Sequence, residues 1–155
     1  MTRSSRAFFI AWAVLIIDRL SKVILMKGLA RGESVKVIPD IFHITLIHNT
    51  GAAFGMFKGR TQVFSAISVF VIALITAYLL RAKQVERVIA VSLGLILGGA
   101  VSNLIDRLWF GYVIDFFDFR IWPVFNIADS CITIGTIILA ASILFGREPN
   151  ASHTR

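Results

Sequence analysis

Long apolar stretches dominate the pattern of hydrophobic and polar positions along the chain. A helix that crosses a bilayer core of about 30 Å needs roughly 20 predominantly apolar residues. Four stretches meet or approach this length, at residues 7–26, 63–80, 88–105 and 125–146. The second and third carry no charge, whereas Asp18, Arg19 and Lys22 interrupt the first. The pattern therefore predicts four membrane-spanning helices.

The segment between the first two stretches, residues 27–62, has a different pattern. HITLIH at residues 43–48 alternates in part and is rich in β-branched residues, which predicts short strands. NTG at residues 49–51 has the composition of a turn. GAAFGMF at residues 51–57 is suited to a short helix or loop lying on the lipid headgroups.

The segment between the last two stretches, residues 107–124, is strongly aromatic, as in LWFGYVIDFFDFRIW. Trp and Tyr favour the boundary between membrane and water. The expected fold is an all-α polytopic membrane protein, with one membrane domain over residues 1–155. In it, four transmembrane helices carry a small extracytoplasmic β-rich platform, built from residues 27–62 and 107–124, with a short interfacial helix or loop.

The orientation follows from the distribution of basic residues. Four spans place both termini on one side of the membrane, and the basic residues are equally numerous on the two sides. The short loop RAKQVER at residues 81–87 is dense in positive charge, and cytoplasmic loops are enriched in Lys and Arg. We therefore expect both termini of this multi-pass protein to be cytoplasmic.

The composition supports membrane embedding independently of the pattern. Of the 155 residues, 57% are hydrophobic and 16% are charged, compared with about 45–50% and 25% in soluble domains. The net charge of +7 could indicate nucleic acid, but the basic residues are scattered among apolar runs. Membrane lipids with anionic headgroups are the expected partner, and nucleic acid is not. Cys131 is the single cysteine, so no disulfide can form within the chain.

Polar residues inside the apolar stretches need partners or a function, because a charge at the bilayer centre costs about 2.5–3.5 kcal/mol. Asp18 and Lys22 are four residues apart and share a helix face. They are either a structural ion pair or part of a site. Asp106 is interpreted as the solvated end of a helix together with Arg107. Asn103, one turn deeper, can bind a substrate backbone or another helix.

Small residues recur every four positions along the third stretch. Such a stripe allows another helix to approach closely, so a packing role is expected. Its members are Ala90, Gly94, Gly98 and Ser102.

Two further aspartates, Asp115 and Asp129, have no cation within four residues on either side and lie at the same membrane boundary. Two carboxyl groups that approach each other in a medium of low dielectric cannot both ionise easily, so one keeps its proton. Such a pair supplies a general base that activates water and an acid that polarises an amide carbonyl. Spacing alone leaves open the alternative that Asp115 caps a turn and Asp129 caps the fourth helix.

No metal site is expected from the histidines. His43 and His48 are five residues apart on a probable strand and so point to opposite faces.

Five motifs in order make the chain resemble the bacterial lipoprotein signal peptidases, or type II signal peptidases. The resemblance covers nearly the whole chain. The motifs are D-x-x-S-K at residues 18–22, HNTGAAF at 48–54, GGAVSNLIDR at 98–107, VIDFF at 113–117 and FNIADS at 125–130. His48 departs from the family, in which an aromatic residue such as Tyr is expected.

The resemblance implies a membrane aspartyl endopeptidase of the bacterial cytoplasmic (inner) membrane, whose site lies towards the outer leaflet. Its substrate would be a diacylglyceryl-modified prolipoprotein, cut just before the lipidated cysteine by an aspartate pair that activates water, without metal or cofactor. Asp115 and Asp129 match the catalytic aspartates, and the protein is expected to be a monomer. The supporting or substrate-binding residues are Asp18, Lys22, Asn49, Gly51, Phe54, Asn103, Arg107 and Asn126.

Two other classes of function compete with this interpretation. A proton-coupled transporter could use Asp18, Asp115 and Asp129 as a relay, but such proteins usually show repeats and midplane carboxylates. A non-catalytic assembly subunit could use the small-residue stripe. The clustering of the aspartates at one boundary favours the peptidase.

Overall fold

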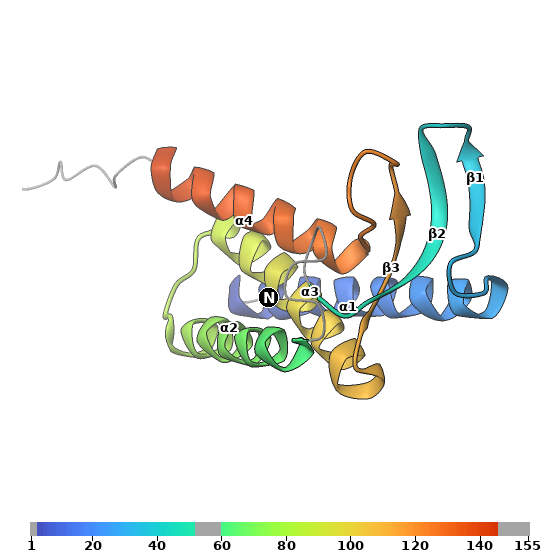
Figure 1. Cartoon of the computed structure of the whole chain (residues 1–155). Helices are drawn as coiled ribbons and strands as arrows, with labels where there is room; N and C mark the ends of the chain where they lie inside the picture. The colour runs from blue at the N-terminus through green and yellow to red at the C-terminus, as the bar shows by residue number, and fades with distance from the viewer. Residues whose placement is uncertain (1–2, 52–59, 146–155) are drawn as a thin grey trace, which may run out of the picture.

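The structure is a computed structural model that describes residues 3–51 and 60–145. Phe54 and most of the predicted interfacial segment lie outside the described residues. The helices form a bundle, and the strands stand across the bundle at one end (Figure 1). In chain order the elements are α1 (Arg3–Gly28), β1 (Ser34–Ile38), β2 (Phe42–Asn49), α2 (Thr61–Arg81), α3 (Arg87–Phe110), β3 (Val113–Asp118) and α4 (Ile127–Phe145).

Three helices in the described part of the chain, α2, α3 and α4, are long and apolar enough to cross a membrane. α2 presents large apolar side chains outward, including Phe70, Leu74 and Leu80, as expected for a surface that faces lipid. α1 is the longest helix, at 26 residues, but carries the charged residues noted above. A membrane-crossing role for α1 therefore stays a prediction.

α3 extends beyond the apolar stretch that predicted it. It continues to Phe110 and ends at Gly111, which adopts a left-handed φ of 78° and donates its backbone N–H to Arg107 O at 3.1 Å. Glycine takes this conformation without the steric penalty that a Cβ would bring. Arg107, which the pattern placed at the start of the platform, thus lies in the last turns of a helix.

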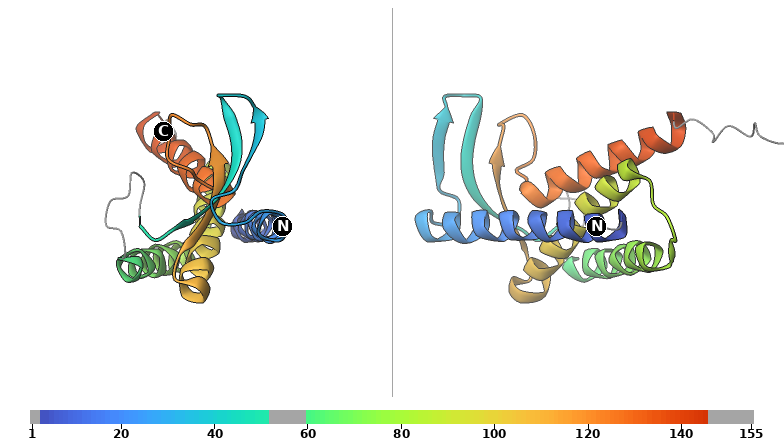
Figure 2. Two further views of the ribbon diagram at one scale, coloured as in Figure 1. Left: turned by 45° about the vertical axis from the view of Figure 1, so that its right-hand side comes forward. Right: turned by 180° about the vertical axis from the view of Figure 1, so that it is seen from behind.

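α3 is the central helix of the bundle, in contact with α1, α2 and α4 (Figure 2). The close approach to α1 depends on small residues. A Cβ on Gly94 would lie 2.7 Å from Ala7 O, and one on Gly98 would lie 2.5 Å from Ala11 O. These contacts confirm the predicted packing role of the stripe.

The strands form one antiparallel sheet in the order β1-β2-β3. Asp40 turns the β1–β2 hairpin with a φ of 60°, a conformation that Asp tolerates better than most residues. β3 pairs with β2 so that Asp115 lies opposite Ile47. The strands predicted around residues 43–48 are confirmed as β2. β3 was not predicted, because its sequence, VIDFFD, shows no strict alternation of apolar and polar residues.

Candidate active site

Asp115 projects from β3 and is 1% exposed. Each of its carboxylate oxygens accepts one hydrogen bond from an asparagine side chain. Asn126 Nδ2 donates to Oδ1 at 2.7 Å, and Asn49 Nδ2 donates to Oδ2 at 2.8 Å. The Asn49 amide is itself oriented, because its Oδ1 accepts the backbone N–H of Gly51 at 3.0 Å. The predicted turn at residues 49–51 therefore aims a donor at Asp115.

Asp129 lies in the first turn of α4 and forms a capping box with Asn126. Its backbone N–H donates to Asn126 Oδ1 at 2.8 Å, and its Oδ2 accepts the backbone N–H of Asn126 at 3.3 Å. This reciprocal pairing satisfies two donors that a helix start leaves free. Its other oxygen, Oδ1, accepts Asn103 Nδ2 at 2.7 Å. Asp129 therefore both caps α4 and lies in the site, although its spacing in the sequence left these roles as alternatives.

Asn126 links the two aspartates. It is fully buried, and its side-chain nitrogen also lies 3.1 Å from Asn103 Oδ1 and 3.2 Å from Ile114 O. Asp115 and Asp129 line the same cleft, which has a volume of about 570 Å³. The structure therefore brings together the two carboxylates that the sequence singled out.

Burial raises the pKa of Asp115, and the nearby charge of Asp129 raises it further. Hydrogen bonds from Asn49 and Asn126 and the charge of Lys22 act in the opposite direction. The net pKa of Asp115 is about 7. A carboxyl group with this pKa can keep its proton near neutral pH and act as an acid.

The remaining wall of the cleft combines one cation with apolar groups. Arg107 lines the cleft, and its guanidinium lies 5.5 Å from the ring centre of Phe64 on α2. Apolar residues of a helix or loop give no chemical signal in a sequence, so Phe64 was not predicted as a site residue. The other lining residues not predicted are Val113, Trp122, Pro123, Val124, Phe125, Ser130, Thr133 and Ile134.

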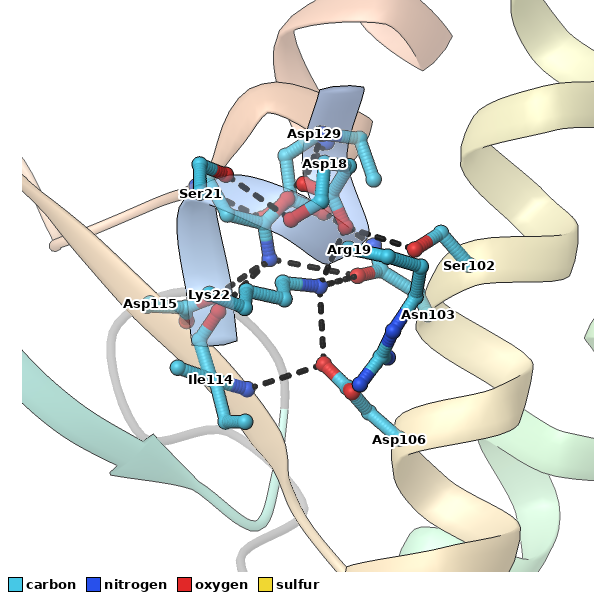
Figure 3. Close-up of polar contacts among 12 residues, drawn as sticks. Asp18, Arg19, Ser21, Lys22, Ser102, Asn103, Asp106, Ile114, Asp115 and Asp129 are labelled. Carbon is cyan, nitrogen blue, oxygen red and sulfur yellow. Dashed lines mark hydrogen bonds and ion pairs between the residues drawn. The ribbon is translucent and has the colours of Figure 1, made fainter. Parts of the chain in front are cut away.

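Lys22 is fully buried, and its side chain points among Asp18, Asn103 and Asp106 (Figure 3). Its ammonium lies 2.7 Å from Asp18 Oδ2, 2.7 Å from Asp106 Oδ2 and 3.1 Å from Asn103 Oδ1. An ammonium has three donors, and these three contacts can use all of them. Of the two alternatives for Asp18 and Lys22, the structure shows the ion pair, which extends to Asp106 on α3.

The two aspartates that pair with Lys22 each hold one backbone N–H next to the site. Asp18 Oδ1 accepts Ala128 N at 2.9 Å, and Asp106 Oδ2 accepts Ile114 N at 3.2 Å. Ala128 precedes Asp129, and Ile114 precedes Asp115. The buried charges thus hold both elements that carry the carboxylate pair.

The interpretation of Asp106 as a solvated helix end is wrong, because its side chain is fully buried. The physical reason is its pairing with two cations of α1, Arg19 and Lys22. These partners come from a remote part of the chain, so the local sequence did not reveal them.

The histidines have other partners. Ser34 Oγ lies 3.2 Å from His43 Nδ1, and the ring of His48 stacks on Tyr112 with 4.0 Å between centroids. Within residues 3–51 and 60–145, no three His, Cys, Asp or Glu side chains are grouped as metal ligands would be.

Comparison with known proteins finds relatives along almost the whole chain. A family model described as signal peptidase (SPase) II matches residues 10–145. The lipoprotein signal peptidase of Moorella thermoacetica is 48% identical over 145 residues, which cover 90% of this chain and 97% of that protein. The lipoprotein signal peptidase of Halothermothrix orenii is 43% identical over 132 residues, which cover 85% of this chain and 90% of that protein.

Two solved structures, each described as a bacterial membrane enzyme studied by the in meso method, are similar in fold. One, at 2.3 Å resolution, has a TM-score of 0.85 and 32% identity, and covers 96% of this chain and 93% of that chain. The other, at 1.9 Å, has a TM-score of 0.80 and 34% identity. The bundle and sheet therefore match the architecture of a bacterial membrane enzyme.

Proposed function

Because the chain belongs to the signal peptidase II family, whose members are aspartic-type peptidases of the bacterial membrane, we propose a specific reaction for it. The chain removes signal peptides from diacylglyceryl-modified prolipoproteins by cutting just before the lipidated cysteine. Family membership implies cleavage of lipoprotein signal peptides. The cleavage position and the assignment of Asp115 and Asp129 as the catalytic pair are parts of the proposal.

One observation carries the assignment of the pair. Asp115 and Asp129 line one cleft and share Asn126, which donates its side chain to the first and its backbone N–H to the second. In the proposed mechanism, the ionised carboxylate takes a proton from a water molecule that attacks the amide carbonyl. The protonated partner donates a hydrogen bond to the carbonyl oxygen, which becomes negative in the tetrahedral intermediate. Proton transfer to the amide nitrogen then releases the two products.

The proposed topology keeps four spans, with cytoplasmic termini and the site towards the extracytoplasmic side. The burial of Asp18 and Lys22 supports α1 as a span, because both side chains are fully enclosed by protein and neither faces lipid. A charge that is paired inside a bundle avoids most of the penalty of exposure to hydrocarbon. A lipid-anchored substrate would then present its scissile bond at headgroup depth, close to the sheet.

Substrate contacts are proposed for the groups around the carboxylates. Asn49, Gly51 and Arg107 line the cleft and could bind the peptide backbone. Phe54 lies outside the described residues, and its supporting or substrate-binding role stays a prediction. A monomer is proposed as the active form, because both carboxylates and their amide partners come from one chain.

The function is tested with purified protein in lipid bilayers and two forms of one prolipoprotein, with and without the diacylglyceryl group. Mass spectrometry of the products should find a new N-terminus at the lipidated cysteine and no cleavage of the unlipidated form. Cleavage at another bond, equal cleavage of both forms, or no cleavage of either would overturn the proposal.

A further inference from the structure

A second set of polar side chains crosses the sheet away from the carboxylate pair. It consists of Ser34 on β1, His43 and Thr45 on β2, and Asp118 at the end of β3, and is called the polar chain below. His43 Nδ1 lies 3.2 Å from Ser34 Oγ, and Ser34 Oγ lies 2.8 Å from Thr45 Oγ1. Thr45 Oγ1 donates to Asp118 Oδ2 at 2.7 Å. His43, Thr45 and Asp118 are buried.

The chemistry of the donors fixes the direction of these hydrogen bonds. An ionised carboxylate only accepts, so the single Thr45 proton points to Asp118. Thr45 Oγ1 must then accept the Ser34 proton, and Ser34 Oγ must accept a proton from His43 Nδ1. Hydrogen bonds aligned in one direction strengthen one another. This assigns the Nδ1–H tautomer to His43, whose Nε2 is buried without a hydrogen-bond partner among the described residues.

Asp118 is well suited to end the polar chain as a carboxylate. Its burial acts to raise its pKa, but hydrogen bonds from Thr45 and from Arg120 outweigh this effect and hold the pKa below the ordinary value. The carboxylate is therefore a stable acceptor at neutral pH.

The same carboxylate holds a strained turn. Asp118 Oδ1 accepts the backbone N–H of Arg120 at 2.9 Å, and Oδ2 accepts Arg120 Nη1 at 3.0 Å. Arg120 has a φ of 65°, and Ile121 N donates to Phe119 O at 2.7 Å, which closes a tight turn around it. A non-glycine residue in this region is strained by about 1–3 kcal/mol and persists only where its surroundings impose it.

This turn sets the shape of one wall of the cleft. The loop is closed at its base, where Phe117 N donates to Phe125 O at 2.7 Å and Phe125 N donates to Phe117 O at 3.1 Å. Within this closed loop, Trp122, Pro123 and Val124 line the cleft. Because both ends are fixed, a change in the turn at Arg120 must move these side chains.

We propose that the polar chain positions the cleft wall of residues 119–125, and that Asp118 is a positioning residue for substrate binding. The inference rests on the proposed peptidase function and adds a determinant of binding to it. Asp115 and Asp129 keep their own partners, Asn49, Asn103 and Asn126. A displaced wall should therefore weaken substrate binding more than it slows the chemical step.

The test compares two substitutions of one buried hydroxyl. Thr45→Val keeps the shape but loses the hydrogen bonds to Ser34 and Asp118, whereas Thr45→Ser keeps the hydroxyl. Thr45→Val should raise KM about five- to tenfold, the loss expected for about one net hydrogen bond, and change kcat less than about twofold. Thr45→Ser should restore the KM. Thr136→Val is the matched control, because the Thr136 hydroxyl donates to Ile132 O of its own helix and has no hydrogen bond to the polar chain.

A structural readout separates this inference from the proposed function. The indole N–H resonance of Trp122 should shift in Thr45→Val and stay in place in Thr45→Ser and Thr136→Val. The nitrogen resonances of His43 should show a protonated Nδ1 in the unchanged protein. If no substrate is cleaved, the peptidase proposal fails, and the resonances still decide the role of the polar chain.

Four results would overturn the inference. They are an unchanged KM in Thr45→Val, a lower kcat at unchanged KM, an equal defect in Thr45→Ser, and an Nε2–H tautomer of His43. Should Thr45→Val fail to fold, Ser34→Ala breaks the polar chain at the exposed strand β1. It should then give a smaller rise in KM, about twofold, with a shifted Trp122 resonance. An unchanged KM in that variant would overturn the inference equally.

Discussion

At the scale of single residues, three asparagines orient the carboxylates of Asp115 and Asp129. Asn49, Asn103 and Asn126 supply a hydrogen bond to every oxygen of Asp115 and Asp129. An amide is a donor and an acceptor at once, so each asparagine can bind a carboxylate and still be fixed by a second partner. This fixes the orientation of each carboxylate before substrate arrives.

Replacing Asn126 tests both its capping of α4 and its role in the site. Asn126→Asp keeps an oxygen that can cap α4 but loses the Nδ2 donor to Asp115. The thermal midpoint of Asn126→Asp should fall, because a carboxylate oxygen would then face the buried oxygens of Asp115, Asn103 and Ile114. Peptidase activity of Asn126→Asp should fall by about 100-fold. Full activity in this variant would exclude the proposed role of the Nδ2 donor.

The pH dependence of activity follows from Asp115. Its pKa of about 7 means that the pair holds one proton below that pH. Above it both carboxyls ionise and no acid is left, so kcat/KM should decline as the pH rises through about 7, approaching tenfold per pH unit. A profile that stays flat to pH 9 would contradict this.

The stability of the fold should also decrease as the pH rises. The reason is that the Asp115 carboxyl releases its proton near pH 4 in the unfolded chain but only near pH 7 in the folded protein. The free energy of unfolding should therefore decrease between about pH 4 and 7.

At the scale of elements, α1 supports the site through buried charges. Lys22 connects Asp18, which binds the start of α4, with Asp106, which binds β3. The ends of three elements are thus fixed to one another. Their relative positions depend on electrostatic pairing as well as on apolar packing.

Removing the Lys22 charge should destabilise the protein strongly. Lys22→Met leaves the Asp18 carboxylate buried without its cation, and breaking such a pair costs about 3–5 kcal/mol. Addition of Asp18→Asn should recover part of the lost thermal stability. Lys27→Met, at the exposed end of α1, is the control and should leave the thermal midpoint nearly unchanged. An equal loss in the control, or no recovery in the double variant, would contradict the pairing.

The sequence predicted some elements better than others, for physical reasons. The apolar stretches revealed the helices because span length and composition are local properties. β3 was missed because VIDFFD lacks the alternation of apolar and polar residues that indicates a strand. The motifs identified Asp115 and Asp129, but the sequence could not show that Asp106 is buried with Arg19 and Lys22. Those contacts join residues 87 and 84 positions apart, so no local pattern reports them.

At the scale of the whole molecule, the sheet lies at one end of the bundle and the short α2–α3 connection lies at the other end (Figure 1). Asp115 belongs to the sheet, and Asp129 lies in the first turn of α4. α3 joins the two ends, because it begins next to the basic loop and reaches the pair through Asn103. With the proposed topology, this arrangement places the site on one side of the membrane.

The orientation can be measured with two matched Lys→Cys variants on a Cys131→Ser background. Lys36 lies on the exposed strand β1, and Lys83 lies in the exposed loop between α2 and α3. In intact cells, a membrane-impermeant thiol reagent should label Lys36→Cys and should label Lys83→Cys only after the membrane is opened. The reverse pattern would contradict cytoplasmic termini.

The central claim is that Asp115 and Asp129 act as one catalytic pair. The most direct test is cleavage of a purified lipidated prolipoprotein by Asp115→Asn and Asp129→Asn, with Asp40→Asn as the matched control. Asp40 is exposed in the hairpin turn with a φ of 60°, which Asn also tolerates. Each site variant should lose activity by at least about 1,000-fold while the control keeps it. Substantial cleavage by either site variant would contradict the pair.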